Sequence, residues 1–198
     1  MEQNKYMVSA VEVLRKAKEY LGQKDWTQVS KKEDWTVLKK KSFNISQIPC
    51  YILESVTHKP AQELVSKIWD VNEEIVKKND HEIASWQEIE KGPNWKVCNQ
   101  TNSAPWPIWP RELVFYQAKI QDNNTTWLVA SSIEHPNVPL RDTQYVRANV
   151  IMSIWGFTPI DQNKTKVCRI MHVEPKGDIP VFLVTSTVNK HVKIIEDL

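Results

Sequence analysis

The side chains that could act as metal ligands or nucleophiles are scattered along this chain. The five histidines show no HxxxH or HExxH spacing, so a metal site is not expected. No GxSxG motif is present, and none of the three cysteines lies in a recognisable nucleophile motif. Only four glycines occur, which excludes a glycine-rich phosphate-binding loop. The sequence therefore predicts no catalytic residues, no metal and no cofactor.

Two parts of the sequence bring acid–base side chains close together. Cys168, Ile170 and His172 occupy alternate positions of a predicted strand and therefore share one face. This pattern favours core packing over a catalytic Cys–His pair, because no third group orients the histidine as a base. Glu82 follows Asp80 and His81, and it could be an acid, a ligand contact or the solvated start of a strand.

Polar side chains on predicted strands are candidates for binding a ligand. Residues 111–120 alternate, so that Gln117 shares a face with Phe115 and Lys119. The amide of Gln117 could donate to and accept from a ligand headgroup. It could instead bond to the backbone in a dry core, because buried polar groups are usually satisfied.

A second polar face follows later in the chain. Its members are Arg147, Asn149, Ile151, Ser153 and Trp155. Arg147 could pair with a phosphate or with an acidic side chain. Pairing with a carboxylate is the favoured alternative, because buried charges are nearly always paired.

Residues 101–110, TNSAPWPIWP, contain three prolines and therefore form a loop or an edge rather than a central strand. Trp106 and Trp109 lie in this loop. They could enter a membrane interface, where Trp is favoured, or they could plug the open end of the fold.

Length and composition predict one domain over residues 1–198, with ample material for a core. The net charge of +2 gives no reason to expect a nucleic-acid partner. Three cysteines without a CxxC motif indicate reduced thiols in a cytosolic protein. No apolar run has the length of a membrane span, and the first residues lack a signal-peptide pattern.

The elements that must position these residues can be read from periodicity. Ser9 and Glu12 form a capping box, and Val8, Val11, Leu14 and Leu21 then predict an amphipathic helix to about residue 21. Short apolar runs at 35–38, 43–45 and 50–57 predict strands. Pro60 starts a second helix with Leu64, Ile68 and Ile75 on one stripe, and residues 73–80 are its solvated end or a loop.

The rest of the chain predicts mostly strands, near 82–90, 95–100, 111–120, 126–134, 145–157 and 165–173. A last helix from about Pro180 carries an apolar stripe of Val181, Val184, Val188, Val192 and Ile195. Short turns between strands favour an antiparallel sheet, and the last helix is the candidate to cover one face of it.

Several segments resemble a known family. The stretch SIEHPNVPLRDTQYVRANV at 132–150, the KTKV strand start at 164–167 and EPKGDIP at 174–180 are similar to the matching parts of START domains, the StAR-related lipid-transfer family. The WPxxxRE motif at 106–112 looks like the family's aromatic-Pro…Arg-Asp motif, with Glu112 where Asp is usual. In order and spacing, the resemblance covers nearly everything after about Tyr51.

The resemblance implies an α+β helix-grip fold, in which a curved antiparallel sheet wraps around a long C-terminal helix and encloses a lipid cavity. It implies a carrier that binds one lipid and moves it between membranes. We therefore predict a cytoplasmic, monomeric protein that associates transiently with membranes and is not an enzyme. An enzyme on the same fold, such as a cyclase or hydrolase with Glu82 as its acid, is one alternative, and a non-transferring lipid sensor or scaffold is another.

The nearest resemblance is to the ceramide and phosphatidylcholine transfer branch. Glu82 and Gln100 match a Glu and a Gln of the ceramide-binding members, but Ile151 and Val192 stand where those members carry Asn and Tyr. Gln117 takes the place of an Arg of the phosphatidylcholine-binding members. The predicted ligand-binding residues are Glu82, Gln100, Gln117, Arg147, Asn149, Ile151, Ser153 and Met171, and the predicted membrane contacts are Trp106 and Trp109.

Overall fold

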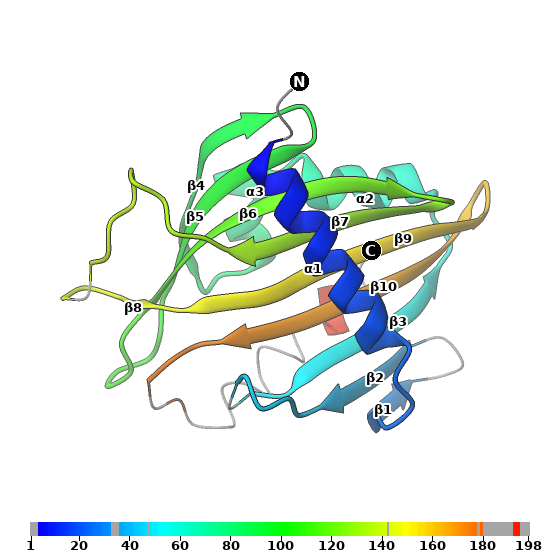
Figure 1. Cartoon of the computed structure of the whole chain (residues 1–198), viewed down its shortest axis with the longest axis horizontal. Helices are drawn as coiled ribbons and strands as arrows, with labels where there is room; N and C mark the ends of the chain where they lie inside the picture. The colour runs from blue at the N-terminus through cyan, green and yellow to red at the C-terminus, as the bar shows by residue number, and fades with distance from the viewer. Residues whose placement is uncertain are drawn as a thin grey trace.

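The computed structural model describes residues 4–32, 36–46, 48–141, 143–177, 179 and 192–194. Within these ranges, a ten-stranded sheet is the centre of the molecule, with α1 (Lys5–Leu21) on one face and α2 (Ala61–Trp69) and α3 (Glu73–Asn79) on the other (Figure 1). The predicted α+β class is confirmed.

The strands follow the order β1-β2-β3-β10-β9-β7-β6-β5-β4 across the sheet. All neighbours on this path are antiparallel, and the two-residue strand β8 pairs with β6 in parallel. The strands are β1 (Thr27–Lys32), β2 (Thr36–Lys41), β3 (Cys50–Thr57), β4 (Ile83–Gly92), β5 (Trp95–Asn102), β6 (Arg111–Asp122), β7 (Thr125–Ser132), β8 (Val146–Arg147), β9 (Asn149–Asp161) and β10 (Lys164–Glu174).

The first helix begins earlier than the predicted capping box. Asn4 is the N-cap, and its side chain accepts hydrogen bonds from the backbone N–H groups of Tyr6 and Met7. The predicted stripe is also wrong at its start, because Val8 and Val11 are exposed. The buried stripe consists of Tyr6, Ala10, Leu14, Ala17 and Tyr20. Small alanines let the helix lie close to the sheet, which residue hydrophobicity alone does not indicate.

Two other predictions about the first half of the chain are wrong. Residues 43–45 form a turn rather than a strand, with the N–H of Ile45 donating to the carbonyl of Phe43. The strand β1 was not predicted, and it is polar and largely exposed. The predicted stripe from Leu64 to Ile75 spans two helices, because α2 ends at Trp69 and the side chain of Asn72 caps α3.

Strand alternation sorts the side chains of the sheet onto two faces. On the α1 face, the helix packs against a cluster that includes Tyr116, Val129, Ile154 and Ile170. On the α2 face, a second cluster consists of Leu53, Leu64, Val65, Leu128, Trp155, Phe157, Val167 and Met171.

The predicted C-terminal helix lies mostly outside the described residues. Residues 192–194 are helical, and Val192 and Ile194 pack against the cluster of the α2 face. These three residues therefore lie on the α2 face, and the rest of the helix that was predicted to cover one face of the sheet lies outside the described residues. Among the helices of the described ranges, none combines the length and apolar character that a membrane span requires.

Candidate functional site

Three predicted ligand residues share one transverse row on the α2 face. Residues that are directly opposite on neighbouring strands lie on the same face of a sheet. Met171 is opposite Ser153, and two further strand pairings connect Ser153 to Gln117. Neighbouring strands lie about 4.8 Å apart, which places Ser153 and Gln117 roughly 10 Å from each other. The row from β3 to β5 is Tyr51, Met171, Ser153, Ala130, Gln117 and Lys96.

The next row along the strands contains a charged residue that sequence reasoning missed. Arg169 is opposite Leu53 on one side and Trp155 on the other. The centre of its guanidinium lies 4.7 Å from the centroid of the Trp155 ring. The available signal was one Arg at an alternate position of an otherwise apolar strand, between Val167 and Met171. Sequence alone could not tell whether that side chain points inward.

Lys96, on the α2 face of the sheet, contacts the last residue of α2. Its ammonium donates to the backbone carbonyl of Trp69 at 2.6 Å and lies 3.8 Å from a carboxylate oxygen of Glu88. The same ammonium lies 4.9 Å from the centroid of the Trp69 ring and 5.4 Å from that of Trp86. Burial lowers the pKa of Lys96, and the charge of Glu88 opposes this effect.

The structure separates the other predicted ligand residues from this row. Gln100 is half-buried and donates to the side chain of Asn102 at 2.8 Å. Ile151 is half-buried, whereas Glu82 and Asn149 are exposed. The roles of these residues in binding a ligand stay predictions.

Arg147 is paired with a buried carboxylate. Its Nη2 lies 2.7 Å and its Nε 3.0 Å from Oε2 of Glu112, and Nη2 also donates to the carbonyls of Val138 and Pro139. Arg141 contacts the other oxygen of Glu112. Burial disfavours the ionised form of Glu112, but the hydrogen bonds and charges of the two arginines outweigh it and lower its pKa. This pairing matches the structural alternative that the sequence favoured for Arg147.

Arg111 fastens the proline-rich loop to the end of β10. Its Nε and Nη2 donate to the carbonyls of Pro175 and Lys176, and its Nη1 donates to that of Trp109. Trp106, in the same loop, is 93% exposed. A side chain with that exposure does not plug the fold, so membrane contact is the alternative that stays a prediction for Trp106. Trp109 and Leu140 are exposed as well.

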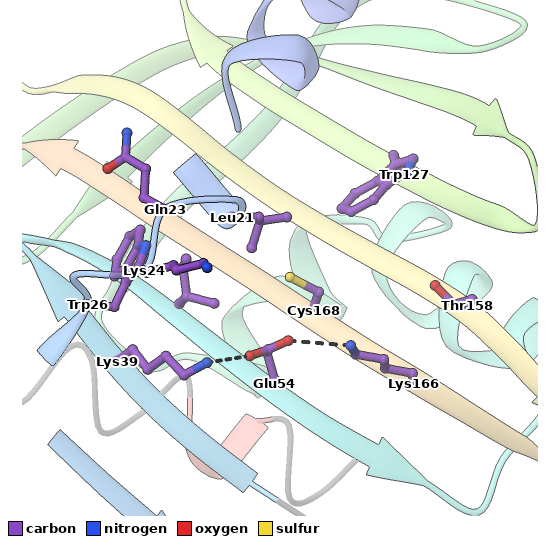
Figure 2. A pocket seen from close by; sticks show the side chains of 11 residues that line it. Leu21, Gln23, Lys24, Trp26, Lys39, Glu54, Trp127, Thr158, Lys166 and Cys168 are labelled. Atoms are coloured by element: carbon purple, nitrogen blue, oxygen red, sulfur yellow. Dashed lines mark hydrogen bonds and ion pairs between the residues drawn. The ribbon is translucent and has the colours of Figure 1, made fainter. Parts of the chain in front are cut away.

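A pocket formed by described residues lies on the α1 face, beyond the C-terminal end of α1 (Figure 2). Its volume is about 520 Å³. Leu21, Trp26, Ile52, Trp127 and Cys168 supply its apolar walls, and Lys24, Lys39, Glu54 and Lys166 supply its charges. The pocket therefore lies on the opposite side of the sheet from Gln117 and Ser153.

The side chains of this pocket are not arranged for nucleophilic chemistry. Glu54 lies between Lys39 at 2.9 Å and Lys166 at 3.4 Å, as Figure 2 shows. Burial raises the pKa of the Cys168 thiol to about 12, so the thiol stays protonated at neutral pH. Among the residues that the structure describes, no group of three His, Cys, Asp or Glu side chains could hold a metal ion.

Solved structures share this arrangement of elements. Human StAR-related lipid transfer protein 5 matches with a TM-score of 0.78 and 17% identity, over 93% of this chain and 89% of that chain. Human STARD10 matches with a TM-score of 0.76 and 18% identity, over 90% and 75%. The human StarD13 (DLC2) lipid transfer and protein localization domain matches with a TM-score of 0.65 and 19% identity, over 92% and 88%. At these identities the likeness shows the fold, and it confirms the predicted helix-grip class.

A comparison with curated protein sequences gives no match. The model of the START domain matches residues 9–193, which is most of the chain. The chain belongs to the START domain family.

Proposed function

We propose that the protein encloses one lipid against the α2 face and moves that lipid between membranes. The observation that carries this proposal is the row on that face, where Ser153 and Gln117 place polar side chains beside the apolar cluster. The names of StAR-related lipid transfer protein 5 and of the StarD13 domain include lipid transfer, and this supports the same role here. The domain spans residues 1–198 and acts as a cytoplasmic monomer that touches membranes transiently.

The physical logic concerns the acyl chains. Each buried CH₂ group contributes ~0.8 kcal/mol, so a lipid needs an apolar enclosure to cross water. The cluster around Leu128, Phe157 and Met171 supplies apolar contacts, and Val192 and Ile194 pack against it. The polar side chains of the row would then select the headgroup. Phosphatidylcholine and ceramide are the candidate ligands, as the sequence resemblance implies.

An enzyme on the same fold requires an acid deep inside the binding region. Glu82 was the candidate for this acid, and it is exposed. No described observation favours the enzyme over the carrier.

The test begins with protein purified from its own cell type. Mass spectrometry of an organic extract should find about one lipid per chain, and the protein should transfer labelled lipid between vesicles. Replacing Gln117 with Leu should change the ratio of headgroups bound. The matched control Gln87→Leu changes an exposed glutamine on β4 and should leave that ratio unchanged. Absence of both bound lipid and transfer would contradict the carrier function.

A further inference from the structure

Arg169 places a charged group inside the apolar α2 face. It stands on β10 between Val167 and Met171, which both belong to the cluster of that face. Its cross-strand neighbours are Leu53 and Trp155. Only 5% of the residue is exposed, so bulk water does not solvate the guanidinium.

The described residues use a small part of the hydrogen-bonding capacity of this group. Nη1 donates to the carbonyls of Ile170 at 2.9 Å and Ile154 at 3.2 Å. Nε is buried and has no partner within the described ranges. A guanidinium carries five N–H donors in a planar fork. Because the Trp155 ring covers one face of it, the edge that carries Nε is the part left for an acceptor.

Arg111 is a buried arginine of the same molecule in which every side-chain nitrogen has a partner. All three of its side-chain nitrogens donate to backbone carbonyls. Toward the described residues, Arg169 donates through Nη1 alone. The difference indicates that Arg169 has capacity for a further partner.

The charge of Arg169 also lacks a counter-ion in the described part of the chain. Two other cations, Arg147 and Lys96, are paired with Glu112 and Glu88, whereas no described carboxylate pairs with Arg169. Burial lowers the pKa of Arg169 to about 9, so the group is still a cation at neutral pH. Buried charges in proteins are nearly always paired. The missing anion is therefore expected on a bound molecule.

The described strands of the α2 face carry further positive charge. Lys119 lies on it with its ammonium 5.1 Å from the centroid of the Trp69 ring. Lys96 adds a second ammonium, and Glu88 is the carboxylate that lies against it. On the described strands, Arg169, Lys119 and Lys96 therefore stand against the carboxylate of Glu88, and this excess of positive charge is complementary to an anionic ligand.

We propose that Arg169 binds the anionic group of the enclosed lipid, a carboxylate or a phosphate. The planar guanidinium fork matches both groups. Ser153 lies diagonally across from Arg169 on β9, within reach of the same group. This inference rests on the proposed lipid-binding function. It predicts a fatty acid or a glycerophospholipid as ligand and excludes ceramide, which has no anion.

The experiment measures binding of three probes that share one labelled acyl chain: a fatty acid, a phosphatidylcholine and a ceramide. Arg169→Leu should weaken binding of the fatty acid or the phosphatidylcholine at least tenfold and leave any ceramide binding within twofold. If Arg169→Leu binds the fatty acid more weakly, the partner of Arg169 is a carboxylate. If it binds phosphatidylcholine more weakly, the partner is a phosphate. Arg169→Lys keeps the charge without the fork and should fall between wild type and Arg169→Leu.

The matched control is Lys16→Leu, which removes one positive charge from the exposed side of α1, on the opposite face of the sheet. It should change binding of every probe less than threefold. If Arg169→Leu weakens binding of ceramide as much as binding of the anionic probes, the assignment of Arg169 is overturned but the carrier function is not. Failure of the wild-type protein to bind any of the probes would overturn both.

A second measurement uses the wild-type protein, in case Arg169→Leu does not fold. The Nε–H resonance of Arg169 can be assigned by its disappearance in Arg169→Lys. It should shift when a fatty acid or a lysophosphatidylcholine is added, and it should stay in place with a monoacylglycerol. An unchanged resonance at saturation with both anionic probes would overturn the proposal.

Discussion

The indole of Trp127 lies against the backbone of Gly156 on the neighbouring strand. The two residues are directly opposite in the β7–β9 pairing. A Cβ atom added at Gly156 would stand 2.8 Å from Cε3 and 2.9 Å from Cη2 of that ring. Real Cβ contacts do not reach such distances, so this position accepts only glycine while the ring stays in place. Trp127 also lines the α1-face pocket, whose wall therefore depends on this contact.

Gly156→Ala should destabilise the protein by about 1–3 kcal/mol, the usual cost of overpacking a core. For a domain of this size, that corresponds to a fall in Tm of roughly 2–12 °C, measured by thermal unfolding. Gly22→Ala is the control, because a Cβ there meets only carbonyl oxygens at 3.6 Å in a helical conformation. It should change the Tm little. Equal effects of the two substitutions would contradict the close contact between Trp127 and Gly156.

Glu112→Gln should lower the free energy of unfolding more than most single substitutions in the described residues. Glu112 is 1% exposed, and its carboxylate balances Arg147 and Arg141. Removing one partner of a buried ion pair costs roughly 3–5 kcal/mol, and the partial exposure of Arg141 places the expected loss near the lower value. Urea unfolding at pH 7 measures it. Glu134→Gln, at an exposed carboxylate, should be neutral within about 0.5 kcal/mol.

The same pair gives a dependence on pH. The pKa of Glu112 is lower in the folded protein than in the unfolded chain. Its contribution to stability is therefore complete above the unfolded pKa and is lost as the pH falls through the folded pKa. The Glu112→Gln variant should lack this part of the acid transition, so its stability should fall less steeply than that of wild type below about pH 4.

Most of the second half of the fold could be predicted because its strands are buried on at least one side. Alternation in residues 111–120 correctly placed Gln117 with Lys119 on one face. The strand β1 could not be found in this way, because its residues are largely exposed and Val29 faces solvent. Hydrophobic periodicity reports burial, and it gives no signal for a strand that buries little.

The candidate site was harder to predict than the fold. Arg147 and Arg169 are both arginines on predicted strands, and only the structure shows that Glu112 neutralises the first and that no described carboxylate neutralises the second. Glu112 lies 35 residues from Arg147 in sequence. The pairing of a charge depends on such distant contacts, so composition and spacing could not distinguish the two arginines.

His172 should make the protein less stable in mild acid. Both of its ring nitrogens are buried without partners among the described residues. Burial, with a smaller effect of Lys16, lowers its pKa from 6.5 to about 4, although Glu174 acts in the opposite direction. Below pH 6.5 the imidazole of His172 is therefore protonated in the unfolded state, whereas in the folded state it stays neutral until about pH 4. Stability should fall across this window, by about 2 kcal/mol between pH 7 and pH 5.

His172→Leu tests this expectation because it keeps an apolar group at the site and removes the titration. Urea unfolding at pH 7 and pH 5 should show a smaller difference for the variant than for wild type. His58→Gln changes an exposed histidine and should keep the wild-type difference. If His172→Leu and wild type lose the same stability between the two pH values, His172 is not buried as a neutral group.

The exposed tryptophans should mediate contact with membranes. Trp106 and Trp109 lie in the loop between β5 and β6, and the exposed Leu140 lies in the loop between β7 and β8, at the same end of the sheet (Figure 1). Trp favours the membrane–water interface. Trp106→Ser with Trp109→Ser should weaken sedimentation with phosphatidylcholine vesicles about tenfold, which is about 1.4 kcal/mol.

Ile160→Ser is the matched control for this experiment. Ile160 is 55% exposed and lies at the hairpin between β9 and β10, at the opposite end of the sheet (Figure 1). Its replacement removes exposed apolar surface without touching the proline-rich loop, so vesicle binding should change less than twofold. Because Arg111 holds Trp109 through its backbone carbonyl, the double variant should keep the wild-type Tm. A loss of vesicle binding by Ile160→Ser equal to that of the double variant would show that membrane contact is not confined to the tryptophan end.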